Sequence, residues 1–132
     1  MVKRILVVDD SPSWIRHHSQ VLNLLYQDKI EIETAGSAIE ANDKLYANAD
    51  NPYDIILTDM QMESNFLPQL AGEWLIEQVQ NMKEYYKTHI VIISATASIK
   101  LIAQKYNVDY IPKYNCREIS NYKNLLDLFI ED

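Results

Sequence analysis

Side chains that could do chemistry follow short apolar runs at several points along this chain. They are Asp9, Asp10, Asp59, Ser94 and Lys113. Short runs rich in Ile and Val are typical of parallel strands buried on both faces, and such sheets bind ligands outside the carboxyl ends of their strands. We therefore expect these five side chains to converge on one pocket. Carboxylates combined with a lysine and a hydroxyl suit a divalent cation and a phosphoryl group.

The aspartates have the chemistry of a Mg²⁺ site. Carboxylates that lie close together repel each other unless a cation offsets their charge. Mg²⁺ takes hard oxygen ligands in octahedral geometry, usually one or two carboxylates together with water and phosphate oxygens. Asp9, Asp10 and Asp59 meet that requirement. The adjacent pair Asp9-Asp10, taken alone, could equally cap the helix that follows it.

Asp59 could also react directly. A carboxylate is a known nucleophile toward phosphoryl groups and forms an aspartyl-phosphate. Phosphoryl transfer needs mainly positioning and charge neutralisation, which a metal ion and Lys113 would supply from two sides. Taken singly, Lys113 could be a solvated loop residue, and Ser94 a hydroxyl that bonds to nearby backbone. Their shared position at strand ends favours a common site.

Strands and helices alternate along the chain and must position these residues. Ser11 with Pro12 predicts a helix that runs to about Tyr26. Ser37 is predicted to open a second helix, and Gly72 to precede a third. The other segments of helical period are residues 97–106 and 119–130. The predicted strands are residues 4–8, 30–34, 54–58, 90–93 and 108–111.

This alternation predicts an α/β fold with a doubly wound, five-stranded parallel sheet and helices on both faces. We expect the strand order 2-1-3-4-5, which is the flavodoxin-like arrangement. At 132 residues the chain has the size of one domain, and it shows no internal repeat, linker or low-complexity tract. Residues 1–132 are therefore expected to form a single domain.

Composition excludes several classes of function. The net charge is −7, the pI is near 4.9 and the 12 Lys and Arg residues are scattered, so we expect neither nucleic acid nor a membrane surface as a partner. The apolar run before Asp9 is too short for a signal peptide, and none approaches the roughly 20 residues of a membrane span. The single Cys116 cannot form an intrachain disulfide. The expected location is the cytoplasm.

The order of the polar residues at the strand ends resembles that of the receiver domain of two-component response regulators, in particular the single-domain chemotaxis regulators. The matching positions, spread over nearly the whole chain, are Asp9-Asp10, Asp59, Ser94-Ala95 and Lys113. This resemblance implies that Asp59 accepts a phosphoryl group from a histidine kinase or a histidine phosphotransfer protein. Such a protein catalyses its own phosphorylation and dephosphorylation, but it is primarily a phosphorelay signalling switch.

The resemblance also implies a set of metal ligands. Asp10 and Asp59 would bind Mg²⁺ directly, and Asp9 would bind it through a water molecule. The backbone carbonyl of Gln61 would complete the protein ligands.

The resemblance further implies how phosphorylation is sensed. Ser94 and Lys113 would hold phosphoryl oxygens, and the small Ala95 would leave access to the acceptor. Tyr110, three residues before Lys113, matches the aromatic switch position of the family and would act together with Ser94. As a strand residue, Tyr110 is equally consistent with ordinary half-buried packing.

The expected effector surface is the face formed by the fourth helix, the fifth strand and the fifth helix. Tyrosines gather in this part of the sequence, and tyrosine is enriched at protein interfaces. The same rings could instead be core or half-buried cover. They are Tyr106, Tyr110, Tyr114 and Tyr122.

Two departures from the family pattern keep a second hypothesis open. The segment from Met62 to Gly72 is several residues longer than usual, and Tyr114 follows Lys113 where receivers usually have proline. The second hypothesis is a pseudo-receiver, an interaction scaffold that works independently of phosphorylation. A third, a small metal-dependent phosphohydrolase, fits Asp59 but lacks a substrate-binding cap domain.

Overall fold

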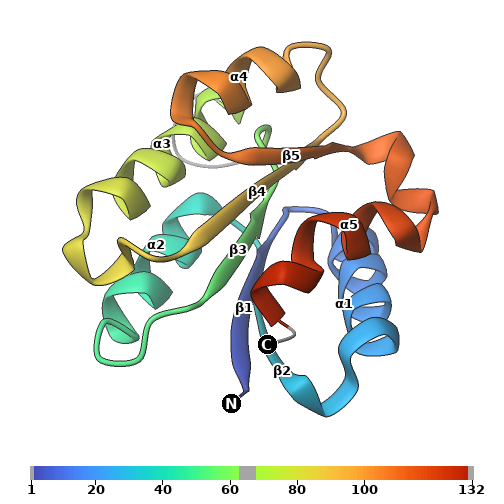
Figure 1. The fold of residues 1–132 in the computed structure, drawn as a ribbon. Helices are drawn as coiled ribbons and strands as arrows, with labels where there is room; N and C mark the ends of the chain where they lie inside the picture. The colour runs from blue at the N-terminus through green and yellow to red at the C-terminus, as the bar shows by residue number, and fades with distance from the viewer. Residues whose placement is uncertain (1, 63–67, 131–132) are drawn as a thin grey trace.

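A five-stranded parallel sheet with the order β2-β1-β3-β4-β5 forms the centre of the computed structural model, which describes residues 2–62 and 68–130 and, for residues 68–70, only the backbone. The predicted fold class and strand order are confirmed (Figure 1). Each strand end lies within one residue of its predicted position. The strands are β1 (Lys3–Val8), β2 (Ile30–Ala35), β3 (Ile55–Thr58), β4 (His89–Ser94) and β5 (Asp109–Pro112).

Helices cover both faces of the sheet. They are α1 (Pro12–Tyr26), α2 (Ala38–Ala47), α3 (Pro68–Asn81), α4 (Ile99–Tyr106) and α5 (Ile119–Ile130), with short 3-10 turns η1 (Gln27–Lys29), η2 (Lys83–Tyr85) and η3 (Lys113–Arg117). The predicted caps of the first two helices are present, because Ser11 Oγ accepts from the backbone N of Trp14 at 3.4 Å and Ser37 Oγ from that of Glu40 at 3.0 Å. Asn107 ends α4 in the left-handed conformation with φ of 56°.

The sheet separates two hydrophobic cores. Helices α2, α3 and α4 lie on one face and α1 and α5 on the other (Figure 1). Successive residues of β1 alternate between them: Leu6 and Val8 belong to the first core, Ile5 and Val7 to the second, and all four are at most 1% exposed. A strand covered on both faces has no solvated side, which explains why its sequence is a continuous apolar run.

The start of the third helix differs from the prediction. Helix α3 begins at Pro68, so Gly72 lies inside it rather than before it. A Cβ at residue 72 would lie 2.5 Å from the backbone O of Asp59 and 2.5 Å from Met60 Cα. Gly72 therefore marks a close approach of two backbones and not a helix boundary. The segment between Met62 and Gly72 was noted above for its length, and residues 63–67 of it lie outside the described residues.

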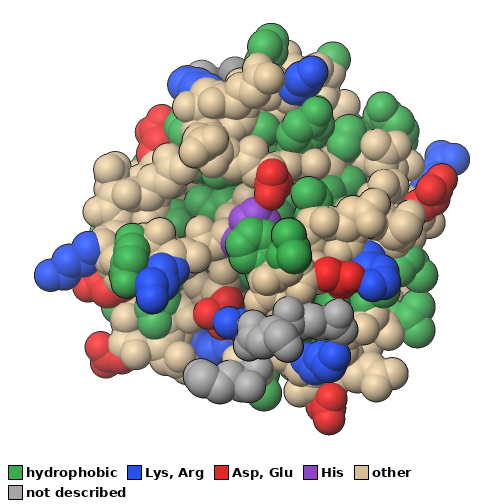
Figure 2. Space-filling view, viewed as in Figure 1, with side chains coloured by type: hydrophobic (Ala, Val, Ile, Leu, Met, Phe, Trp, Pro, Cys, Tyr) green, Lys and Arg blue, Asp and Glu red, His purple; other side chains and the backbone are tan. Residues whose placement is uncertain are grey.

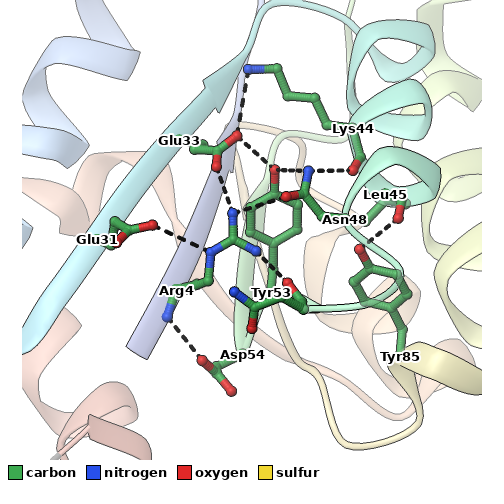
Figure 3. A network of polar contacts seen from close by, with 10 residues as sticks. Arg4, Glu31, Glu33, Lys44, Leu45, Asn48, Tyr53, Asp54 and Tyr85 are labelled. Atoms are coloured by element: carbon green, nitrogen blue, oxygen red, sulfur yellow. Dashed lines mark hydrogen bonds and ion pairs between the residues drawn. The ribbon is translucent and has the colours of Figure 1, made fainter. Parts of the chain in front are cut away.

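Arg4 organises a polar network at the amino-terminal edge of the sheet (Figure 3). Its Nη2 donates to Glu33 Oε2 on β2 at 2.6 Å and to Asn48 Oδ1 after α2 at 3.0 Å. Its guanidinium lies 4.7 Å from the ring centroid of Tyr53, and its backbone N donates to Asp54 Oδ2 at 2.9 Å. The network ties β1 to β2 and to the connection before β3, and so holds these three strands in register.

Charged side chains are scattered over the face of the molecule drawn in Figure 2, and several blue and red groups lie next to one another. Among the described residues, no helix combines the length and the apolar character needed to cross a bilayer.

Candidate functional site

Parallel pairing brings the carboxyl ends of the strands to one edge of the sheet. Val8 pairs with Thr58, so the residues that follow these two strand ends emerge side by side. The backbone N of Asp59 then donates to Val8 O at 3.0 Å, and that of Asp9 to Ala35 O at 3.1 Å. The ladder thus extends one residue past the strands and orients both aspartates toward the same space.

The predicted aspartates form a cluster. One carboxylate oxygen from each of Asp9, Asp10 and Asp59 lies within 4.8 Å of the other two. Asp9 is 1% exposed and Asp59 5%, whereas Asp10 is exposed to solvent. Two buried carboxylates beside a third at a solvent-open edge fit a hard divalent cation, which keeps several water ligands.

Asp59 is held from two sides. Its Oδ1 accepts from the backbone N of Met60 at 2.7 Å and from that of Gln61 at 3.4 Å, while its Oδ2 accepts from Lys113 Nζ at 3.2 Å. Burial raises the pKa of Asp59, the Lys113 ammonium lowers it and the Asp9 carboxylate raises it again, so that the net shift of this pKa is upward. Burial is therefore the main reason that the Asp59 carboxylate is harder to ionise than a free aspartate, and the ammonium of Lys113 only partly compensates for it.

Lys113 joins the two buried aspartates. Its Nζ lies 3.0 Å from Asp9 Oδ2 and 3.2 Å from Asp59 Oδ2, and its side chain is 13% exposed. Burial lowers the pKa of Lys113, but the two carboxylates outweigh burial and the net shift is upward, so the ammonium stays charged. Asp9 Oδ2 accepts no hydrogen bond among the described residues and is offset by this ion pair. A buried oxygen with spare acceptor capacity fits a place beside a cation.

Ser94 ends β4 and is 1% exposed. Its Oγ accepts a hydrogen bond from the backbone N of Thr96 at 3.2 Å. This is the bond to nearby backbone that the sequence offered as the alternative to a role in the site. The hydrogen bonds of the described residues include none between Ser94 and Asp59. The structure thus places Ser94 at the same sheet edge without joining it to the acceptor.

Tyr110 lies on β5, and Gln61 lies in the segment that follows β3. Tyr110 pairs with Ile92 in the sheet, is half-buried and packs against the core on the α2, α3 and α4 face. Gln61 is exposed, two residues after Asp59, and its backbone N contacts that carboxylate.

The tyrosines of the C-terminal third do not share one surface. Tyr122 is 0% exposed, and its OH lies 2.7 Å from His18 Nδ1, so of the two alternatives left open for this ring the core position is the one observed. It faces inward from α5 against α1. Tyr106 is half-buried, and its OH lies 2.9 Å from a carboxylate oxygen of Glu73 and 2.9 Å from one of Glu77 on α3, either of which can accept its proton. Tyr114 is 72% exposed.

Sequence reasoning missed Trp14, which contacts the site from α1. The Lys113 ammonium lies 5.0 Å from the centroid of the Trp14 ring, a separation typical of a cation–π contact. Trp14 is in the first turn of the helix that Asp9-Asp10 precedes, which is the signal that could have indicated its proximity to the aspartates.

A cavity of about 500 Å³ lies elsewhere, near the first residues of β4 and β5. It is lined by residues that include Gln80, Thr88, His89, Asn107 and Asp109, and by none of the strand-end residues described above. The strands begin at this edge and end at the acidic cluster, so the cavity and the cluster lie at opposite ends of the sheet.

The fold and this strand-end site define a receiver domain. The family model of the response regulator receiver domain matches residues 5–121, and the chain belongs to this family. Receiver domains are the phospho-accepting modules of two-component signalling; they generally bind Mg²⁺ and interact with histidine kinases or phosphotransfer proteins and with effectors.

Solved structures share the fold at low sequence identity. The phosphorylated cyanobacterial phytochrome response regulator RcpA has a TM-score of 0.79 and 23% identity over 99% of this chain and 96% of its own. Chemotaxis protein CheY4 of Vibrio cholerae has a TM-score of 0.76 and 20% identity over 98% and 99%. The BeF3-activated DrrB receiver domain has 0.73 and 16% over the full length of both chains. Among curated protein sequences, none matches this chain.

Proposed function

We propose that this protein is a phosphorylation switch in which Asp59 takes a phosphoryl group from a histidine kinase or a histidine phosphotransfer protein. The observation that carries the proposal is the position of Lys113 Nζ, 3.2 Å from Asp59 Oδ2 and 3.0 Å from Asp9 Oδ2. A buried acceptor carboxylate, a second carboxylate and a fixed ammonium are the charges that an aspartyl-phosphate site requires.

The proposed Mg²⁺ ligands are the carboxylates of Asp10 and Asp59 directly, Asp9 through water, and the backbone carbonyl of Gln61. The mutual proximity of the acidic oxygens supports this set. The burial of Asp9 and Asp59 supports it as well, because buried carboxylates close to each other are stabilised by a bound cation. Bound there, the metal would neutralise charge on the phosphoryl oxygens.

In the transfer step, a carboxylate oxygen of Asp59 bonds to phosphorus as the phosphorus–nitrogen bond to the donor imidazole breaks. Lys113 leaves its ion pair with Asp9 and binds a phosphoryl oxygen. Ser94 gives up its bond from the Thr96 backbone, which is 3.2 Å long, and its hydroxyl donates to another phosphoryl oxygen. The movement of Ser94 opens space into which the Tyr110 ring turns, and the effector surface changes.

The proposed effector surface is the face of α4, β5 and α5, with the phosphorelay acting in the cytoplasm and residues 1–132 forming one receiver domain. Exposed apolar side chains on or beside these elements support a protein-binding role. They are Leu101 at 69%, Tyr114 at 72%, Leu128 at 86% and Phe129 at 40% exposure.

Acetyl phosphate with Mg²⁺ tests the proposal. Intact-mass spectrometry should find one added phosphoryl group in the wild type and none in Asp59→Ala. Asp28→Ala, which removes an exposed carboxylate in η1, is the matched control and should be labelled like the wild type. An unchanged wild-type mass under conditions that label an ordinary receiver would instead identify a pseudo-receiver that acts as a scaffold.

A further inference from the structure

Helix α1 places an aromatic ring against the lysine of the site. Asp9 Oδ1 accepts from the backbone N of Ser11 at 2.9 Å, and Ser11 Oγ caps the backbone N of Trp14 at 3.4 Å. The acidic residue and the ring are therefore linked through one helix cap. The Lys113 ammonium lies 5.0 Å from the Trp14 ring centroid, so the cation has the ring on one side and the carboxylates within ion-pair distance.

Two histidines hold that ring and the turn that carries Lys113. The ring of Trp14 stacks on His18 with centroids 5.4 Å apart and meets the edge of His17 at 5.5 Å. His17 Nε2 lies 2.7 Å from the backbone O of Cys116 in η3, the turn that begins with Lys113. Residues at i, i+3 and i+4 share one side of a helix, and this side of α1 fastens the lysine turn.

His18, on which the Trp14 ring stacks, also contacts the last helix, α5. Its Nδ1 lies 2.7 Å from the OH of Tyr122 on α5, and both side chains are at most 2% exposed. The half-buried ring of Trp14 thus packs against a histidine that is itself fixed between α1 and α5, which restrains the position of the ring.

The ion pairs of Lys113 with Asp9 and Asp59 must rearrange when a phosphoryl group binds, and the residue that follows the lysine does not hold it in place. Tyr114 is 72% exposed, so the residue after the lysine does not pack the turn against the domain. A lysine side chain is a flexible four-carbon stem with a strongly hydrated charge, and it loses conformational freedom when it is held in one place. A ring that restrains the ammonium in advance reduces that cost at the moment of phosphoryl binding.

We propose that Trp14 is a positioning residue for phosphoryl transfer, which holds the Lys113 ammonium beside the acceptor through a cation–π contact supported by His17 and His18. The inference rests on the proposed function, because Lys113 is taken there to bind the phosphoryl group. Trp14 acts through Lys113 and contributes no group to the reaction.

The first test measures how tightly the protein binds beryllofluoride, which is a phosphoryl mimic, in the presence of Mg²⁺. Trp14→Leu should weaken binding roughly 3- to 10-fold, and Trp14→Phe should retain most of it, as expected for loss and retention of a ring face. In a Lys113→Ala background, Trp14→Leu should cause no further loss. Leu25→Ala, which removes packing from the same helix away from Lys113, should bind like the wild type.

A shape-preserving variant separates the charge contact from packing. The chain has two tryptophans, so fluorotryptophan incorporated into a Trp74→Phe background labels Trp14 alone. Fluorination weakens the ring face without changing its fit, and affinity should fall stepwise with each added fluorine. This variant also keeps the test decisive if Trp14→Leu does not fold.

The Lys113 side-chain protons report on the contact without any phosphoryl chemistry. In the unliganded wild type they should be shifted upfield by the Trp14 ring current, and the shift should vanish in Trp14→Leu. A wild type that binds beryllofluoride while the Trp14 and fluorinated variants bind it equally well would overturn the inference alone. A wild type with the shift but no beryllofluoride binding would overturn the proposed function, and the positioning role with it.

Discussion

Lys113 reaches Asp59 across 54 residues of sequence and donates to its Oδ2 at 3.2 Å. In this state the ammonium is shared with the second buried carboxylate, and the net effect on the acceptor is still a raised pKa. The single positive charge of Lys113 faces two buried carboxylates, so a second cation would offset the remaining negative charge. The geometry therefore favours a site that becomes complete when a divalent metal binds.

Added Mg²⁺ should raise the melting temperature of the protein, because a ligand that binds only the folded state stabilises it by mass action. At tenfold excess over the dissociation constant, the gain of about 1.4 kcal/mol corresponds to a rise of about 5 °C. Asp10→Ala should abolish the rise, and Asp28→Ala should retain it. Thermal melts or calorimetry would measure this, and a wild type indifferent to Mg²⁺ would count against the metal site.

Gly72→Ala should destabilise the protein and weaken Mg²⁺ binding. The new Cβ would lie 2.5 Å from backbone atoms of Asp59 and Met60, which cannot turn aside as a side chain can. We expect a loss of about 2–4 kcal/mol in the free energy of unfolding, measured by urea denaturation.

Gly36→Ala is the matched control for Gly72→Ala. Its Cβ would meet nothing closer than Glu40 Oε1 at 3.6 Å, and neither glycine has a positive φ. The stability of this variant should stay within about 0.5 kcal/mol of the wild type. Equal losses at both positions would show that close backbone packing is not the cause.

Acidification should destabilise the protein through His18. Burial, followed by the charges of His17 and Lys113, lowers the pKa of His18 to about 3, and the Tyr122 hydroxyl lies 2.7 Å from its Nδ1. In the unfolded chain His18 binds a proton below about pH 6.5, whereas in the folded state it stays neutral. The contribution of His18 to the free energy of unfolding is therefore fully present above about pH 6.5 and is lost as the pH falls.

His18→Asn keeps a polar atom near the Tyr122 hydroxyl and removes the titration. Between pH 7 and pH 5 the wild type should lose about 2 kcal/mol more stability than this variant. Urea denaturation at the two pH values measures the difference. The same pH dependence in both proteins would contradict the assignment to His18.

Arg4→Met should destabilise the sheet at the edge away from the acidic cluster. It removes one partner of Glu33, which keeps its contacts with Tyr53 and Lys44, and it removes the cation over the Tyr53 ring (Figure 3). Because Glu33 is 35% exposed, we expect a loss of about 2 kcal/mol rather than that of a fully buried pair. Arg16→Met, an exposed position on α1, should be neutral. Comparable urea midpoints for both variants would contradict this role of Arg4.

Binding of beryllofluoride should change the amide exchange and the NMR shifts of residues 97–122, where the switch is proposed to act. To bind a phosphoryl oxygen, the Ser94 hydroxyl must give up its hydrogen bond from the Thr96 backbone N. Tyr110 is half-buried beside the core, so its ring can turn when Ser94 moves. Amide exchange or NMR shifts measured with and without the ligand test this. Changes confined to residues around Asp59 would show that the signal does not reach this face, and Ser94→Ala should reduce any change that does.

Much of the fold was predictable because local patterns carry it. Ile5 to Val8 is apolar at every position since both faces of the strand are covered, and Ser11 and Ser37 cap helices through bonds to backbone three residues away. The convergence of the aspartates followed from one topological rule, that parallel strands end at the same edge. Each of these features depends on residues close in sequence or on the topology of the sheet, and not on the packing of distant side chains.

The tertiary structure alone decided which residues meet across the sheet and between helices. Gly72 was read as a helix boundary because its real constraint, the backbone of residues 59 and 60, is distant in sequence. Tyr122 stayed open between a surface and a core position because helical period does not tell which side of α5 faces α1. The contact of Trp14 with Lys113 joins elements 99 residues apart, as does the bond from His17 to Cys116. Such contacts arise from packing, and a local pattern carries no information about them.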